Sequence, residues 1–431
     1  MKLVADLQIH SKYSRAVSQQ MVLENLDKWA KIKGINVLGT GDLTHPLWLK
    51  EIKQKLEPAE PGLFKLKKQY KVDSFGRLEK DFEPRFMLTG EISCIYSKGG
   101  KVRRVHHLYL VPDIETAEKI NTQLSFIGNL KSDGRPILGL DSKEFLKICL
   151  EASPEVMVIP AHAWTPWFSI FGSKSGFDSI EECFDEYSKS IYAVETGLSS
   201  DPAMNWRLSQ LDKVALVSNS DSHSLTRIGR EANVFDVELS YADIIEAIKS
   251  RDPKKFLFTI EFFPEEGKYH YDGHRLCKVS LSPEQTKKHN FLCPQCRRPL
   301  TIGVLARVDQ LADRPEGFKP SRLILYKNSI PLDQVIADSL GMAGTGNTGW
   351  PKAVVQEYEK LIKGGGNEFK VLLDSTKEEL NSITLPQIAE GIMKVREGAV
   401  HIEPGYDGEY GKIKIFTANE IENISKQASL L

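Results

Sequence analysis

The chain has 431 residues, a length typical of two or three domains, and its 41% hydrophobic and 27% charged residues are ordinary for a globular protein. A net charge of −1 excludes nucleic-acid binding through overall charge, so any such surface must be a local basic patch. A helix needs a run of about 18 to 20 apolar residues to span a membrane, and the sequence contains no such run. Asp6 interrupts the apolar N-terminus, so we predict no signal peptide and expect a cytoplasmic protein.

Strand and helix patterns alternate along the first part of the chain. A helix is predicted over residues 22–33, where apolar residues share one face and Gly34 is placed as a C-terminal cap. Regular alternation over about 250 residues predicts a parallel α/β barrel. The seven predicted strands are Leu3–Ile9, Ile35–Thr40, Phe86–Ile95, Val102–Val111, Val156–Ala161, Ile191–Glu195 and Val214–Ser218.

The pattern changes after Phe256. A strand-rich segment leads into a loop-rich stretch that contains three cysteines, and Pro315, Gly317 and Pro320 then indicate a boundary. Helical patterns dominate the last hundred or so residues. We therefore predict three domains: a barrel (1–252), a small metal-binding module (253–316) and a mainly helical C-terminal domain (317–431).

Nearly every predicted strand of the first domain ends in a side chain that can bind a metal. Because the carboxyl ends of parallel strands meet on one face of a barrel, we expect these side chains to converge. Mixed histidine and carboxylate ligands favour zinc, manganese or iron, whereas magnesium usually prefers more oxygen ligands. A multi-metal cluster can polarise a phosphoryl oxygen and activate water, so this set favours phosphoester hydrolysis. Its members are Gln8, His10, Asp42, His45, Glu91, His106, His107, His162, Glu195, Asp221 and His223.

The first and last motifs of this set resemble a known family. Asp6–Ser11 resembles the opening motif of PHP (polymerase and histidinol phosphatase) domains, and Ser220–His223 resembles their closing motif. The resemblance covers about residues 1–250. It implies a distorted seven-stranded, TIM-like βα barrel with a multi-metal phosphoesterase site. It also implies metal roles for His10, Asp42, His45, Glu91, His107, His162, Asp221 and His223, among which we assign catalytic roles to Glu91, Asp221 and His223.

Some positions depart from the family pattern. Gln8 replaces the first of two histidines; as a candidate ligand it is weak and neutral, so one metal would bind loosely or be lost. His107 is preferred over His106 because the family histidine directly precedes an apolar pair. His45 is separated from Asp42 by two residues, whereas the family has an adjacent pair. Glu195 is either a ligand or a group that supports one.

A second set of metal ligands lies close together in the sequence. His274 and Cys277 are separated from Cys293 and Cys296 by fifteen residues, and each pair has two residues between its members. This spacing matches a closed tetrahedral zinc site with three cysteines and one histidine. Cysteines at this spacing in a cytosolic chain favour metal over disulfides. We therefore predict one structural zinc ion, with His270 and Asp272 as nearby substitutes for His274.

Further segments resemble the endonuclease Q family: Pro264–Cys277, Gly303–Val308 with Leu311–Arg314, and Glu403–Gly411. The likeness extends over essentially the whole chain. Members of this family cut DNA on the 5′ side of deaminated bases (uracil, hypoxanthine, xanthine) and of abasic sites. The resemblance implies a nucleoid-associated DNA repair endonuclease that hydrolyses the phosphodiester with water activated by zinc, manganese or magnesium. The residues by themselves imply only phosphoester hydrolysis.

Several residues are candidates for DNA contacts. Damaged bases are commonly flipped into a pocket, and Trp164, Trp167 and Phe168 either line such a pocket or pack in the core. Two alternatives remain open: a PHP phosphatase that acts on a small phosphomonoester, and a catalytically degenerate PHP scaffold that binds DNA. Basic side chains that could contact DNA phosphates are Lys98, Lys101, Arg103, Arg104, Arg297 and Arg298.

Overall fold

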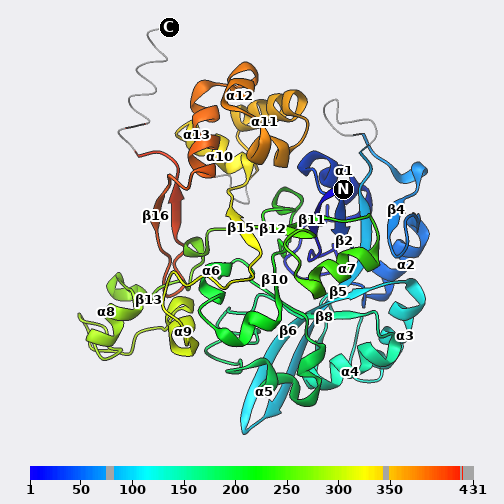
Figure 1. The fold of residues 1–431 in the computed structure, drawn as a ribbon, viewed down its shortest axis with the longest axis horizontal. Helices are drawn as coiled ribbons and strands as arrows, with labels where there is room; N and C mark the ends of the chain where they lie inside the picture. The colour runs from blue at the N-terminus through cyan, green and yellow to red at the C-terminus, as the bar shows by residue number, and fades with distance from the viewer. Residues whose placement is uncertain (74–81, 343–348, 418–419, 421–431) are drawn as a thin grey trace.

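A mixed, eleven-stranded β-sheet runs through the protein, with helices packed along it (Figure 1). The structure is a computed structural model that describes residues 1–73, 82–342, 349–417 and 420. Strand β1 (Lys2–Asp6) lies between β2 (Val37–Gly39), which is parallel to it, and β11 (Ala232–Asp236), which is antiparallel. The sheet continues from β2 to β5 (Arg85–Lys98) on one side and from β11 to β12 (Phe256–Glu261) on the other.

All seven predicted strands are present, and β1, β2 and β5 pair parallel as predicted, but the prediction that all seven run parallel is wrong. Strand β5 pairs with β6 (Lys101–Val111) as a long antiparallel hairpin, and β6 pairs antiparallel with β8 (Met157–Pro160). Only Gly99 and Gly100 connect β5 to β6, with φ angles of 61° and 73°. Such a two-residue turn reverses the chain and cannot form the long crossover that parallel strands need.

The last two of the seven strands form a pair of their own. Strands β9 (Ala193–Glu195) and β10 (Ala215–Val217) are parallel. The backbone N–H of Ser218, just after β10, donates to the side chain of Asn233 in β11. Ile9 forms a parallel bridge with Ser222, so the chain beyond β1 and the chain beyond β10 lie side by side.

The helices of this part begin and end where local chemistry dictates. Helix α1 (Leu23–Lys33) ends at Gly34, whose φ of 86° confirms the predicted cap. Asp113 and Asp141 accept hydrogen bonds from backbone N–H groups at the starts of α3 and α4. The remaining elements here are α2 (Pro46–Lys55), β3 (Leu56–Pro58), β4 (Phe64–Leu66), α3 (Ile114–Ser125), β7 (Ile137–Leu138), α4 (Ser142–Ala152), α5 (Ile180–Phe184), α6 (Pro202–Asn205) and α7 (Tyr241–Ser250).

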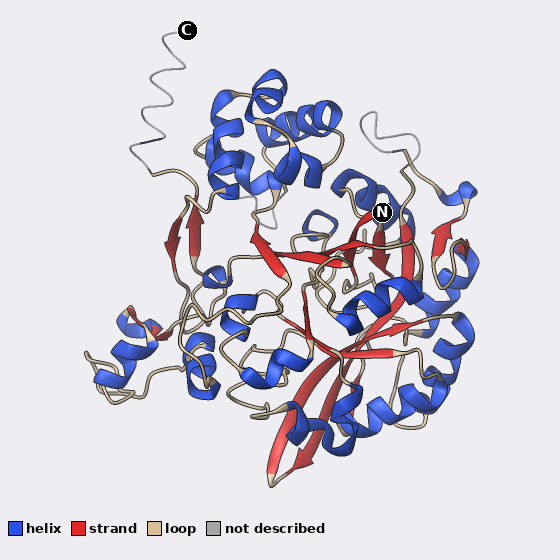
Figure 2. Cartoon of the chain, viewed as in Figure 1, coloured by secondary structure: helices blue, strands red, loops and turns tan. Residues whose placement is uncertain are grey.

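Two smaller units follow, and Figure 2 shows that one is mainly helical. The helical unit surrounds an apolar core of its own that includes Leu361, Ile388 and Ile392. Strand β15 (Leu325–Asn328) pairs with β12, so the large sheet includes strands from all three predicted domains. No helix among the described residues is long and apolar enough to cross a membrane. The units contain β13 (Asp272–His274), β14 (Val279–Leu281), α8 (Pro283–Lys288), α9 (Val304–Leu311), α10 (Leu332–Ser339), α11 (Lys352–Gly365), α12 (Lys377–Ile383), α13 (Pro386–Arg396), β16 (His401–Glu403) and β17 (Lys412–Lys414).

Candidate active site

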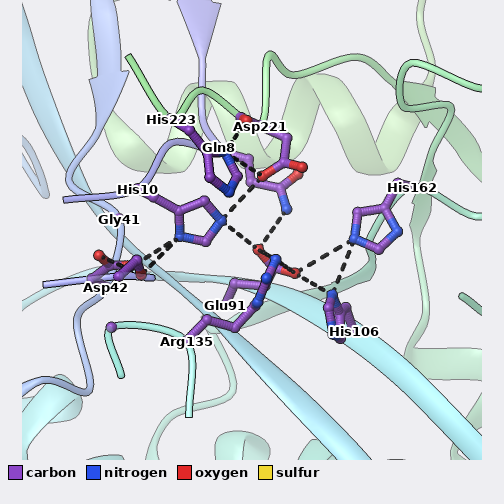
Figure 3. Close-up of polar contacts among 12 residues, drawn as sticks. Gln8, His10, Gly41, Asp42, Glu91, His106, Arg135, His162, Asp221 and His223 are labelled. Carbon is purple, nitrogen blue, oxygen red and sulfur yellow. Dashed lines mark hydrogen bonds and ion pairs between the residues drawn. The ribbon is translucent and has the colours of Figure 1, made fainter. Parts of the chain in front are cut away.

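Most of the predicted ligands meet around the carboxylate of Glu91, which projects from β5 (Figure 3). Its Oε2 atom lies 3.1 Å from Nε2 of His10 and accepts a 2.9 Å hydrogen bond from Nε2 of Gln8. Its Oε1 atom lies 2.8 Å from Nδ1 of His106 and 3.5 Å from Nε2 of His162. Glu91 therefore stands between two groups of donors: His10, Asp221 and His223 on one side, and His106 and His162 on the other.

Asp42 lies behind His10 and outside both groups. One of its oxygens is 2.9 Å from Nδ1 of His10. The other accepts hydrogen bonds from the backbone N–H and hydroxyl of Ser11 and from the hydroxyl of Ser14. Because these contacts use both oxygens, Asp42 orients the His10 ring so that Nε2 faces Glu91 and Asp221.

The donor atoms of the first group fit a divalent metal. Nε2 of His10 lies 3.0 Å from Oδ1 of Asp221 as an ion pair, but neither buried atom makes a hydrogen bond of regular geometry among the described residues. Buried polar atoms are normally paired. Two ligand atoms that each lie about 2.1 Å from a metal at right angles are about 3 Å apart, which matches the spacing found here.

The electrostatics of the cluster also favour a cation. Burial lowers the pKa of His10, but the carboxylates of Asp42, Asp221 and Glu91 outweigh it and raise that pKa well above its usual value. Burial raises the pKa of Glu91, yet Arg135 and the neighbouring histidines lower it well below normal. Burial lowers the pKa of His106 to about 4. At neutral pH Glu91 is therefore a charged carboxylate and His106 a neutral imidazole, the forms that bind metals, whereas the raised pKa of His10 means that a metal binding there displaces a proton.

The structure places His107, a predicted ligand, outside the two donor groups. Its Nε2 lies 2.8 Å from the hydroxyl of Ser142, and its ring packs against Phe145 and Phe184. Neighbouring residues on a strand point to opposite faces, so only one of the two adjacent histidines can face Glu91. The register of β5 and β6 puts His106 on that face.

His45 and Glu195 also lie outside the two donor groups. His45 stacks on the ring of Tyr13, with ring centroids 4.3 Å apart. Glu195 accepts a hydrogen bond from the side chain of Asn219 and another from the backbone N–H of His162. Burial raises the pKa of Glu195 to about 8. Of the two predicted roles of Glu195, the structure therefore favours support of the His162 loop.

The turns that carry the ligands adopt an unusual backbone conformation. Asp42, His162 and Asp221 have φ angles of 48°, 31° and 45°. Residues other than glycine rarely adopt positive φ, and such residues cluster at functional sites. Arg135 is a site residue that the sequence did not reveal: its guanidinium lies 3.3 Å from Glu91, but it comes from a loop without a strand-end pattern.

A pocket of about 830 Å³ opens beside the second donor group. His106, His162 and Asp221 line it together with Trp167 and Tyr269, whose rings meet edge to face at 5.9 Å. The Trp167 side chain is 39% exposed. Two more aromatic residues and three basic residues also line the pocket: Phe168, Tyr410, Arg104, Arg230 and Lys268.

The candidate DNA contacts and the third aromatic residue have different surroundings. Trp164 is buried and donates a hydrogen bond to Asn205, so it packs in the core. Lys98 pairs with Asp185 at 2.9 Å, and Arg103 lies over the ring of Phe177. Arg104 reaches the pocket, whereas Lys101, Arg297 and Arg298 are exposed.

The second predicted metal site is also assembled. The ligand atoms of His274, Cys277, Cys293 and Cys296 all lie within 4.8 Å of one another. Burial raises the pKa of Cys293, but hydrogen bonds from the backbone at Cys296 and Gln295 outweigh it and lower that pKa to about 7. A thiol that loses its proton easily is well suited to bind zinc.

Some known proteins resemble a part of this chain, and others resemble nearly all of it. A family model described as the MJ0043 C-terminal domain matches residues 331–399. The uncharacterized protein MJ0043 of Methanocaldococcus jannaschii is 35% identical over 277 residues, 62% of this chain. Since this covers 33% of that relative, the chain matches about a third of its length. The uncharacterized protein YqxK of Bacillus subtilis is 30% identical over 96% of this chain and 99% of its own.

Solved structures give a likeness over the full length. The lesion-specific endonuclease PfuEndoQ of Pyrococcus furiosus superposes with a TM-score of 0.82 and 29% identity, over 98% of this chain and 99% of its own. An endonuclease Q in complex with a 27-mer duplex substrate, with an abasic lesion at the active site, gives a TM-score of 0.82 and 30% identity over 98% of both chains. The chain belongs to the endonuclease Q family. The endonuclease Q likeness therefore includes the large sheet, the cysteine-rich module and the helical unit.

Proposed function

We propose that this protein is a DNA repair endonuclease that cuts on the 5′ side of deaminated bases and abasic sites, with a PHP-type barrel and divalent metals at Glu91. One observation carries the proposal. A metal-capable cluster opens onto a pocket lined by aromatic and basic side chains, in a chain that superposes over 98% of its length on an endonuclease Q bound to lesion-containing DNA.

The geometry of the cluster suits phosphodiester hydrolysis. The metals would be held by six side chains: His10, Glu91, His106, His162, Asp221 and His223. Divalent metals, when bound, would polarise a phosphoryl oxygen and make water nucleophilic near neutral pH. Asp42 keeps the His10 ring oriented, and the Arg135 guanidinium adds positive charge where a phosphate would enter.

The pocket suits a base that has left the helix. Trp167, Phe168 and Tyr269 present ring faces or edges, and stacking on aromatic rings holds a flipped or single-stranded base. Damaged pairs cost less to open than intact ones, which favours lesions over normal DNA. Arg104 and Lys268 at the pocket would attract the flanking phosphates.

The test uses labelled duplexes that contain uracil, hypoxanthine, xanthine, an abasic site or no lesion, in the presence of magnesium or manganese. We expect cleavage on the 5′ side of each lesion and none in the intact duplex. Turnover of small phosphomonoesters without any DNA cleavage would contradict the proposal and favour a phosphatase. Binding of lesion DNA without either reaction would contradict it in favour of a scaffold.

A further inference from the structure

The two oxygens of Glu91 face donor sets of different composition. The first position comprises Oε2 of Glu91 with His10, Asp221 and His223. The second position comprises Oε1 of Glu91 with His106 and His162. Each position has two imidazoles, so the difference between them depends on their oxygen atoms.

Gln8 adds an oxygen to the first position. Its side chain is 1% exposed, and its Nε2 donates to Oε2 of Glu91 at 2.9 Å. The carbonyl oxygen Oε1 of Gln8 is buried and has no hydrogen-bond partner among the described residues. Figure 3 shows its carboxamide between the carboxylates of Asp221 and Glu91. Three buried atoms that make no hydrogen bond among the described residues therefore belong to this position: Gln8 Oε1 and the ion-paired Asp221 Oδ1 and His10 Nε2.

We propose that the two positions select different metals, and that Gln8 sets the difference. The first position offers three oxygens and two nitrogens, which suits a hard, six-coordinate cation such as Mg²⁺ or Mn²⁺. The second offers two imidazoles and one carboxylate oxygen, a set that binds zinc and leaves a fourth position open. This inference rests on the metal site of the proposed function and is independent of its DNA substrate.

The test replaces the amide oxygen with an imidazole nitrogen. The wild-type protein and the Gln8→His variant are equilibrated with Zn²⁺ and excess Mn²⁺, and bound metals are counted by elemental analysis, with Mn²⁺ also followed by electron paramagnetic resonance. We expect Gln8→His to bind one additional zinc ion per chain and to bind Mn²⁺ at least about tenfold more weakly, because nitrogen ligands favour zinc. Gln8→Glu keeps an oxygen at this position and should retain Mn²⁺.

A control separates this effect from general disturbance of the site. His107→Gln makes the reverse exchange on the opposite face of β6 and should leave both metal counts unchanged. The cysteine-rich site contributes the same zinc in every variant, so only differences are compared. Equal zinc and manganese binding by wild type and Gln8→His would overturn the proposal. If the metals exchange as expected but wild type cuts no lesion duplex, the proposed function fails and this inference stands.

Discussion

The protein has two metal-capable clusters that are built in opposite ways. The cysteine-rich cluster takes its four ligands from one short segment, His274 to Cys296, and its ligand set is complete. The Glu91 cluster collects its metal-capable side chains from His10 to His223, on turns and strands spread over half of the chain, and one side opens to a pocket. A closed set of ligands suits a structural metal, whereas an open position lets substrate or water reach the metal. The difference teaches that local spacing makes a structural site, while a reactive site needs the whole sheet.

The largest expected effect is a loss of DNA cleavage, without a loss of folding, when a ligand of the open cluster is replaced. Asp221→Asn removes a charged donor while keeping a residue that tolerates its φ of 45°. We expect DNA cleavage to fall by more than about 10³-fold. Thermal unfolding and lesion-duplex cleavage are measured together. A variant that cuts normally would show that Asp221 is not part of the catalytic site.

Loss of a ligand in the closed cluster should instead disturb local folding. Cys293→Ser removes a buried sulfur from the proposed zinc site, and a structural zinc of this kind contributes on the order of 10 kcal/mol to local folding. We expect one zinc fewer per chain and faster hydrogen exchange in residues 272–300, with little change in the large sheet. Cys149→Ser, at a buried cysteine of the sheet core, is the matched control and should keep the zinc. Unchanged zinc content in Cys293→Ser would refute a site here.

Two adjacent histidines of the open cluster should behave differently. His106→Gln removes a nitrogen that faces Glu91, so we expect the loss of one bound metal and at least about 10²-fold slower cleavage. His107→Gln should keep the metals and lower the free energy of unfolding by about 1–3 kcal/mol, because Ser142 loses a buried partner. Metal analysis and denaturant unfolding distinguish the two. The reverse result would restore His107 as the ligand.

The smallest expected effect is on the salt dependence of DNA binding, and it tests whether the module that contains the closed cluster contacts DNA. Exposed arginines that touch phosphates release counterions, so replacing both Arg297 and Arg298 with Ala should reduce the salt dependence of duplex binding by about 2 in log–log slope. Fluorescence anisotropy at several salt concentrations measures this slope. Lys98→Ala is the comparison, and we expect less change because Lys98 already pairs with Asp185. A slope that stays constant in the double arginine variant would exclude these phosphate contacts.

Some features could be predicted from the sequence because their signals are local. Strand positions follow from runs of apolar residues, and the cap at Gly34 follows from one residue type at a helix end. The directions of β5, β6 and β8 were predicted wrongly, although Gly99-Gly100 between two apolar runs is a typical hairpin signal. A hairpin at this position predicts that the two strands pair antiparallel. The resulting register puts His106, and not His107, on the same face as Glu91.

The sequence by itself determined the endonuclease Q family, the strand positions and the gathering of His274, Cys277, Cys293 and Cys296 as a metal-capable set. Each depends on residues close together in the chain or on motifs. Only the tertiary structure decided which side chains meet Glu91. It places Asp42, His45 and His107 outside the donor groups, brings in His106 and Arg135, and leaves an oxygen of Gln8 without a partner among the described residues. The physical reason is that strand register and the direction of each turn fix where a side chain points, and both depend on pairing between distant segments.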